Sequence, residues 1–134
     1  MKYYIITTSK DHVLKGISGG FCQACHGKKF PMEKLKKEDW IIFYSPKIKF
    51  NENNEANKLK KFTAIGQVID DKIYQIEQVP DFIPWRRNIN FILNINEVNL
   101  SDLKCKLNYI LFRYGFFEIS YEQFIEIKTK MLKE

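Results

Sequence analysis

The sequence predicts an α+β fold around a small, twisted, barrel-like sheet of about five or six strands, flanked by short helices and a C-terminal helix. Short segments of β-branched and aromatic residues recur along the chain, and short stretches of helical spacing lie between and after them. The strands do not alternate regularly with long helices, which disfavours a doubly wound sheet. A length of 134 residues gives room for one domain, 1–134, with one core.

Five segments are expected to form strands because β-branched or aromatic residues are concentrated in them or alternate with polar ones. They are residues 3–8, 40–44, 62–69, 72–79 and 89–95. Asp70 and Asp71 separate two of them and are expected to turn a hairpin. Gly66 indicates a bulge or close packing within its strand. Residues 51–58 are polar and are expected to form a surface loop.

Helices are expected over residues 11–17, 31–36 and 100–111 and from Ser120 onward. Pro31 suits a first helical turn, and Ser101 is a plausible cap for the third helix. Ser120 and Gln123 have the spacing of a capping box. Phe124, Ile127 and Met131 then mark the buried face of the last helix.

Basic and aromatic residues are interleaved in the middle of the chain. The net charge is +6, and the stretch from Lys28 to Lys61 holds ten lysines and five acidic residues, so it carries most of that excess. Phe30, Trp40, Phe43, Tyr44 and Phe50 lie among them. This pattern is typical of single-strand or flipped-base binding. A solvated basic surface over an aromatic core has the same sequence pattern.

The motif Cys22-Gln23-Ala24-Cys25-His26 matches the pattern of c-type haem attachment and contains a possible pair of zinc ligands. A second C-x-x-C is absent from the sequence, and adjacent Cys25 and His26 are poorly placed to ligate one ion. We therefore expect free thiols, with no metal and no cofactor. Neither a phosphate-cradling glycine loop nor a nucleophile signature is present in the sequence, so catalysis is not expected.

No stretch of the sequence approaches the length of a membrane span, and we expect a cytoplasmic protein that does not bind membranes. The segment Pro84-Trp85-Arg86-Arg87 is expected to be a recognition loop, because it combines an amphipathic ring with two planar donors. The alternative is a Trp that plugs the sheet edge beside solvated arginines.

Several segments form a joint pattern. They are Asp11-His12-Val13, Gly19-Gly20-Phe21 with Gln23, Cys25-His26-Gly27-Lys28, Asp39-Trp40, Tyr44-Ser45-Pro46, 62–66 and Pro84-Trp85-Arg86-Arg87. Together these segments resemble the small stand-alone EVE-domain proteins. The resemblance covers nearly the whole chain. It implies a PUA-like barrel, similar to YTH and ASCH domains, and binding of a modified nucleotide in a pocket with aromatic walls. Glu38 stands where family members usually have glycine, which questions only the type of that turn.

The resemblance implies a set of site residues. The ligand-binding candidates are Ser9, Gly20, Phe21, Gln23, Tyr44, Ser45, Trp85, Arg86 and Arg87. The phosphate-contact candidates, from the basic stretch, are Lys28, Lys29, Lys47 and Lys49. Phe21 and Trp85 are expected to stack on a flat base, with Arg86 or Arg87 on the flanking phosphate.

The expected function is therefore non-catalytic binding of DNA or RNA that carries a modified base, most simply a methylated one. Two alternatives stay open: an enzyme that acts on nucleotides or RNA, as some ASCH relatives do, and a small-molecule or protein-binding domain. The sequence does not distinguish DNA from RNA, or a monomer from a weak dimer.

Overall fold

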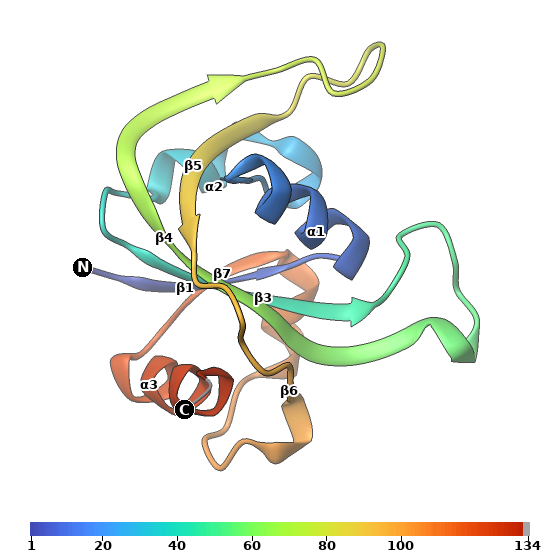
Figure 1. Cartoon of the computed structure of the whole chain (residues 1–134), viewed down its shortest axis with the longest axis vertical. Coiled ribbons are helices and arrows are strands. Elements are labelled where there is room, and N and C mark those ends of the chain that lie inside the picture. Colours follow the sequence, from blue (N-terminus) through green and yellow to red (C-terminus); the bar gives the residue numbers. More distant parts are fainter. Residues whose placement is uncertain (133–134) are drawn as a thin grey trace.

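A computed structural model describes residues 1–132 and contains one curved sheet with helices on both faces (Figure 1). The strands are β1 (Tyr3–Thr7), β2 (Phe21–Cys22), β3 (Trp40–Lys47), β4 (Lys58–Gln75), β5 (Trp85–Phe91), β6 (Val98–Asn99) and β7 (Phe116–Ile119). Their order is β2-β5-β4-β3-β1-β7, and β6 pairs with β4. β1 and β3 are parallel, and the other pairs are antiparallel. The terminal strands β2 and β7 do not pair, so the sheet is open where a barrel was expected.

Helices α1 (Lys10–Gly19) and α2 (Lys29–Lys34) lie in the connection from β1 to β3, and α3 (Tyr121–Met131) follows β7. In Figure 1, α1 and α2 lie on one side of the sheet and α3 on the other. Four 3₁₀ turns complete the structure: η1 (Cys25–Gly27), η2 (Glu55–Asn57), η3 (Leu100–Asp102) and η4 (Tyr109–Tyr114). Within the described residues, no helix is long and apolar enough to span a membrane.

Alternation along the strands builds a core on each face of the sheet. On β3, Ile41 and Phe43 face the first core cluster, whereas Ile42 and Tyr44 face the second. The helices supply the opposing surfaces. Val13, Met32 and Leu35 complete the first core cluster, and Phe124, Ile127 and Met131 complete the second.

The expected hairpin turn at Asp70 and Asp71 is wrong, because β4 runs through these residues as one strand. Its pairing with β5 jumps from Val68–Ile89 to Ile73–Arg87, which defines a bulge. Side chains of β5 satisfy the polar groups of this bulge. Arg87 donates to the Asp70 carbonyl at 2.7 Å, and Asn88 donates to the Asp70 carboxylate at 2.9 Å.

The expected helix over residues 100–111 is also wrong. Only the short turns η3 and η4 form, and Asn99 rather than Ser101 lies at the N-cap of η3. The segment between them is held to α3, because Glu126 accepts the backbone N–H groups of Lys104 and Cys105 at 2.6 and 2.9 Å. The capping box of α3 is confirmed, with both Ser120 and Gln123 making the reciprocal bonds.

Candidate functional site

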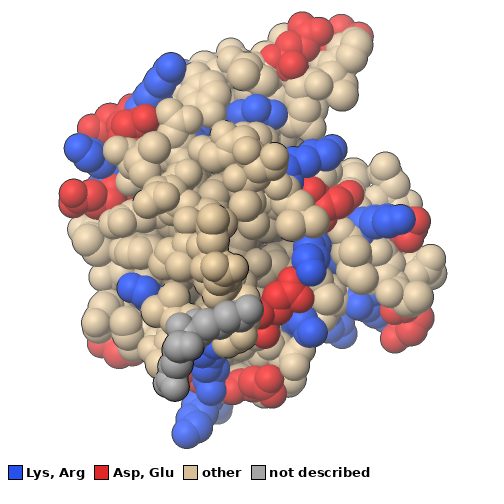
Figure 2. Space-filling model, in the orientation of Figure 1, with Lys and Arg blue, Asp and Glu red and all other residues tan. Residues whose placement is uncertain are grey.

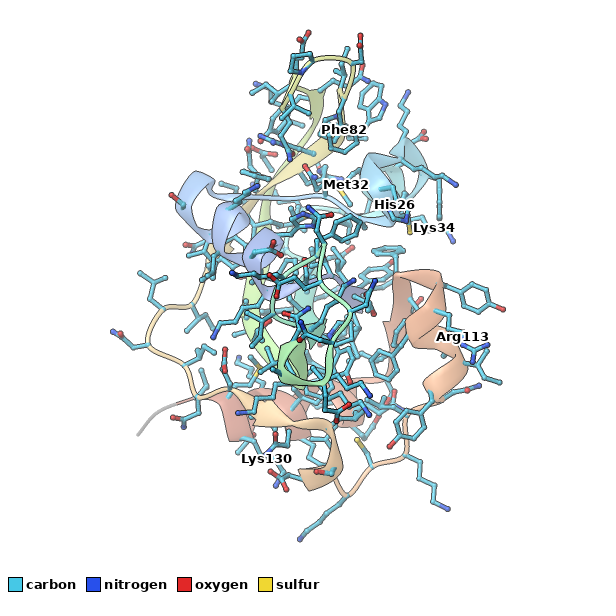
Figure 3. All side chains as sticks on the ribbon, turned by 90° about the vertical axis from the view of Figure 1, so that its right-hand side faces the viewer. His26, Met32, Lys34, Phe82, Arg113 and Lys130 are labelled. Atoms are coloured by element: carbon cyan, nitrogen blue, oxygen red, sulfur yellow. The ribbon has the colours of Figure 1, made fainter. Side chains whose placement is uncertain are left out.

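A cavity of about 770 Å³ opens on the face of the sheet covered by α1 and α2. Its walls come from segments far apart in the sequence: the end of β1, the start of α1, residues 21–28, the loop after β3, the connection from β4 to β5 (residues 76–84, the β4–β5 arm) and the segment before β7. Figure 3 shows His26, Phe82 and Arg113 on three of these segments. The volume suits a ligand of nucleotide size.

Aromatic rings form much of the cavity wall. The rings are those of Phe21, Phe30, Phe43, Phe50, Phe82, Phe91, Phe112 and Tyr114. Phe50 stacks on His12 with ring centroids 5.0 Å apart, and Phe43 packs against Phe91 at 5.5 Å. Such walls can accommodate a flat heterocycle by stacking.

The charged side chains that line the cavity are basic. Lys15, Lys28, Lys47 and Arg113 line it, and among the described lining residues there is no Asp or Glu. The Lys47 ammonium lies 5.1 Å from the centre of the Phe50 ring. The site therefore combines stacking surface with an attraction for anions.

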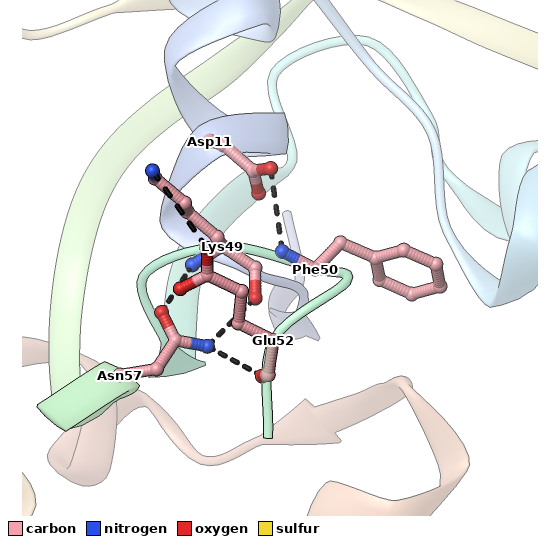
Figure 4. A network of polar contacts seen from close by, with 5 residues as sticks. All are labelled: Asp11, Lys49, Phe50, Glu52 and Asn57. Atoms are coloured by element: carbon pink, nitrogen blue, oxygen red, sulfur yellow. Dashed lines mark hydrogen bonds and ion pairs between the residues drawn. The ribbon is translucent and has the colours of Figure 1, made fainter. Parts of the chain in front are cut away.

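The loop that carries Phe50 is held by a network of hydrogen bonds (Figure 4). Asp11 accepts the Phe50 N–H at 3.3 Å, and the Asn57 side chain bonds the Lys49 N–H and carbonyl, both at 2.8 Å. Partial burial alone would raise the pKa of Asp11, but hydrogen bonds from the Ser9 hydroxyl and the Phe50 N–H lower it overall. The Phe50 ring is thus presented by a loop with a fixed backbone.

The η1 turn places His26 at the cavity through an unusual backbone. Cys25, His26 and Gly27 have consecutive φ values of 52°, 61° and 79°. Left-handed conformations at two non-glycine residues cost energy, and such strain clusters at functional sites. A Cβ on Gly27 would lie 2.5 Å from the Cβ of Pro84, so glycine is also required by this close approach.

Three polar side chains beside the cavity, those of Gln23, Gln78 and Arg86, are hydrogen-bonded to one another. Arg86 donates to Gln23 Oε1 at 3.1 Å and to Gln78 Oε1 at 3.0 Å. Its guanidinium also lies 3.7 Å from the centre of the Phe21 ring, so one face of that ring is covered. Gln23 and Gln78 line the cavity, whereas Arg86 does not, so the arginine orients the two amides.

Burial lowers the pKa of His12, although Asp11 acts in the opposite direction. The imidazole is therefore neutral at pH 7 and offers a flat surface together with one donor and one acceptor. Its Nδ1 lies 3.5 Å from the Thr8 hydroxyl.

The structure brings five of the expected site residues together and places the others elsewhere. Lining the cavity are Ser9, Phe21, Gln23, Lys28 and Lys47. Outside the lining are Gly20, Lys29, Tyr44, Ser45, Lys49, Trp85, Arg86 and Arg87. Gly20 is the C-cap of α1, with φ 70°. The Lys49 ammonium lies 3.9 Å from the Glu52 carboxylate. Although Ser9 lines the cavity, its hydroxyl proton is already donated to the Asp11 carboxylate.

Arg87 has a structural position that corrects the expected phosphate contact. It is 1% exposed and donates to the backbone carbonyls of Met32, Leu35 and Asp70. These bonds tie the end of α2 to the β4 bulge. A group this buried does not present its donors to a phosphate.

Tyr44, Ser45 and Trp85 also have packing positions. Tyr44 belongs to the second core cluster, on the opposite face from the cavity, and Ser45 is fully buried and bonds Thr63 at 2.7 Å. Trp85 begins β5 instead of lying in a loop. Its ring packs against the first core cluster, with the Lys29 ammonium 4.7 Å above it.

Sequence reasoning missed several cavity residues, among them His12, Gln78, Phe82, Arg113 and Tyr114. The sequence motifs contained His12 and His26, but neither histidine was among the candidate ligand-binding residues. The arm and the segment before β7 carry no local motif. Only the curvature of the sheet brings them to the cavity.

The cysteines of the C-x-x-C-H motif have separate environments. The Cys22 thiol is buried, and its sulfur lies 3.8 Å from the Met32 sulfur. Burial raises the pKa of this thiol to about 12. The Cys25 thiol instead donates to the Tyr114 carbonyl at 3.1 Å. Among residues 1–132, no three His, Cys, Asp or Glu side chains are grouped to hold a metal ion.

Comparison with known proteins agrees with the resemblance of the sequence motifs. The family model described as "EVE domain" matches residues 2–130. The chain is 41% identical to the UPF0310 protein YdcG of Bacillus subtilis, covering 96% of this chain and 91% of that protein. It is 37% identical to a UPF0310 protein of Streptococcus gordonii, covering 97% and 93% respectively.

Two solved structures share the fold at low sequence identity. An NMR structure of a Rhodopseudomonas palustris protein matches with a TM-score of 0.58 at 17% identity, covering 97% of this chain and 93% of that one. A crystal structure of a Pseudomonas syringae protein matches with a TM-score of 0.59 at 13% identity, covering 97% and 99%. Because the family model matches nearly the whole length of this chain, the chain belongs to the EVE-domain family.

Proposed function

We propose that the protein is a non-catalytic nucleic-acid-binding module that holds a modified base, most simply a methylated one, in the cavity. Membership of a family with a PUA-like fold supports nucleic-acid binding in general terms. The observation that carries the finer proposal is the lining of the cavity, which combines rings, lysines and amides and includes no acidic residue among those described.

The rings supply what an extruded base needs. A base leaves a stack only if a pocket returns the lost stacking, which is worth a few kcal/mol. Phe50 and His12 form one wall. The Oε1 atoms of Gln23 and Gln78 both accept from Arg86, and Gln23 Nε2 donates to Gln78 Oε1 at 3.3 Å. Among the described contacts, the side-chain N–H groups of Gln78 therefore remain as donors for a base edge. Lys28 and Lys47 then lie near enough to the cavity to contact the backbone phosphates.

The experiment is a binding titration with oligonucleotides that carry 5-methylcytosine, N6-methyladenine or no modification in one sequence. We expect one methylated oligonucleotide to bind about fourfold or more tightly than its unmodified form, since a buried methyl group contributes about 0.8 kcal/mol. Equal affinity for all of them would contradict recognition of a methylated base. Mass spectrometry of the recovered oligonucleotide tests the absence of catalysis, which predicts an unchanged mass.

A variant pair locates the binding site. Phe50→Ala should weaken binding by about 1–3 kcal/mol, the usual loss for a stacking ring. Ile48→Ala is the matched control, because Ile48 is exposed on the same loop and does not line the cavity. Equal loss in both variants, or in neither, would rule out stacking on Phe50.

A further inference from the structure

An exposed aromatic surface borders the cavity beside η4. Tyr109, Ile110 and Tyr114 are 68%, 59% and 63% exposed, and Arg113 lies between them in sequence. We call these four residues the η4 surface. Large apolar side chains gathered in one exposed patch mark an interaction site more often than solitary ones do. Arg113 and Tyr114 also line the cavity, so the two surfaces are continuous.

Hydrogen bonds and ring packing fix the backbone of this segment, so its exposed rings have a defined position on the surface. Asn108 caps η4 by accepting the Ile110 N–H at 3.0 Å. Phe112 packs between Tyr44 and Phe117, with centroids 4.5 and 5.2 Å away. The Thr7 N–H donates to the Gly115 carbonyl at 3.0 Å, which joins the segment to the end of β1.

The charge of this segment favours an anionic partner. Residues 103–117 contain Lys104, Lys106 and Arg113 and no Asp or Glu. All three cations are exposed, and none forms an ion pair with a described residue. The nearby carboxylate of Glu126 is bonded to the backbone of Lys104 and Cys105.

We propose that the η4 surface is a path for single-stranded nucleic acid, on which bases next to the one in the cavity stack. The proposal rests on the proposed function and adds the strandedness of the substrate. Base faces are hidden inside a duplex, and exposed rings with nearby cations are the usual platform for unpaired bases. DNA and RNA share this chemistry.

The test compares the wild type with the double variant Tyr109→Ala/Tyr114→Ala. The probes are DNA and RNA single strands of roughly 12 nucleotides, the length range of one such site, and the matching duplexes. We expect single strands to bind more tightly than duplexes and the double variant to lose at least about fivefold in affinity for them. Tyr121→Ala is the matched control, because Tyr121 is 54% exposed on α3 and should change nothing.

Further measurements separate this proposal from the proposed function. Free methylated nucleoside needs only the cavity, so it should bind the single variant Tyr109→Ala as it binds the wild type, because Tyr109 does not line the cavity. Single-strand binding that depends on the tyrosines but ignores methylation would overturn the proposed function and keep the η4 path. Tighter binding of duplexes, or wild-type affinity in a folded double variant, would overturn the path. A double variant that turns a dimer into a monomer would also overturn it and assign the surface to self-association.

Discussion

Adjacent arginines on β5 have different tasks. Arg86 lies over Phe21 and orients the amides of Gln23 and Gln78 at the cavity. Arg87 is buried below and holds three carbonyl oxygens, while its Nε has no partner among the described residues. The loss of Arg87 should therefore affect folding, whereas the loss of Arg86 should affect the cavity.

Replacing Arg87 by Met should reduce the free energy of unfolding by roughly 3 kcal/mol or more, because the buried carbonyls of Met32 and Leu35 and the partly buried carbonyl of Asp70 lose a charged donor. Urea unfolding measures this loss. Arg113→Met is the control, and as an exposed substitution it should stay within about 0.5 kcal/mol. A fully stable Arg87→Met variant that no longer bound nucleic acid would instead assign this arginine to a phosphate.

The lowered pKa of His12 predicts that stability depends on pH. The unfolded chain binds a proton near the ordinary value of about 6.5, whereas burial lowers the pKa in the folded protein. Protons therefore favour the unfolded state, and the contribution of neutral His12 is lost as the pH falls from about 7 through its folded pKa. Thermal unfolding of wild type and His12→Gln from pH 7.5 to about 5 should show a smaller decline in the variant. Parallel curves would contradict the direction of the pKa shift.

At the scale of elements, helix α3 depends on a local signal that the sequence contains. The capping box of Ser120 and Gln123 lies directly after β7 and begins the helix that covers the second core cluster. Ser120→Ala should cost about 1 kcal/mol in urea unfolding, since one N-terminal N–H loses its acceptor. Ser101→Ala is a matched control, because the Ser101 side chain caps no helix. Equal effects of the two substitutions would show that the cap bond does not contribute.

Local signals explain which elements could be predicted. Runs of β-branched and aromatic residues identified β1, β3 and most of β4, and capping chemistry identified α3. The strand expected over residues 89–95 overlaps β5 only at residues 89–91, because β5 begins at Trp85 and ends at Phe91. The bulge of β4 was misread as a turn because Asp70 is satisfied by Arg87 and Asn88, which lie far along the chain. The spacing of leucines after residue 100 suggested a helix, but contacts with α3 hold the segment between η3 and η4 in an irregular conformation.

The candidate site was predictable only in part for the same reason. Motifs around Ser9, Phe21 and Gln23 pointed to residues that do line the cavity. Trp85 and the arginines beside it looked like a recognition loop, yet they begin a strand and pack inward. The opposite wall comes from η4, which contains three aromatic residues but no local motif.

At the scale of the whole molecule, the open sheet creates the site. The ends of the sheet approach each other without pairing, and the Cys25 thiol bonds to the Tyr114 carbonyl across this opening. Figure 2 shows acidic and basic side chains interspersed over the face in view, without a large patch of one sign. Phosphate attraction should therefore come from the few lysines at the cavity.

Salt dependence tests this distribution. The double variant Lys28→Ala/Lys47→Ala should reduce the slope of log K against log salt by about one to two, since each lysine that neutralises a phosphate contributes nearly one. Lys36→Ala/Lys37→Ala removes the same charge away from the cavity and should leave the slope nearly unchanged. Equal slopes for both variants would indicate general attraction by the net charge.

The most direct test of base binding is a crystal structure of the protein with a single-stranded oligonucleotide that carries a methylated base. The arrangement of the cavity predicts one flat heterocycle inside it, against the Phe50 and His12 wall, with its edge toward Gln23 or Gln78. Flanking phosphates should lie near Lys28 or Lys47. An oligonucleotide bound elsewhere on the protein, with no base in the cavity, would contradict the proposed function.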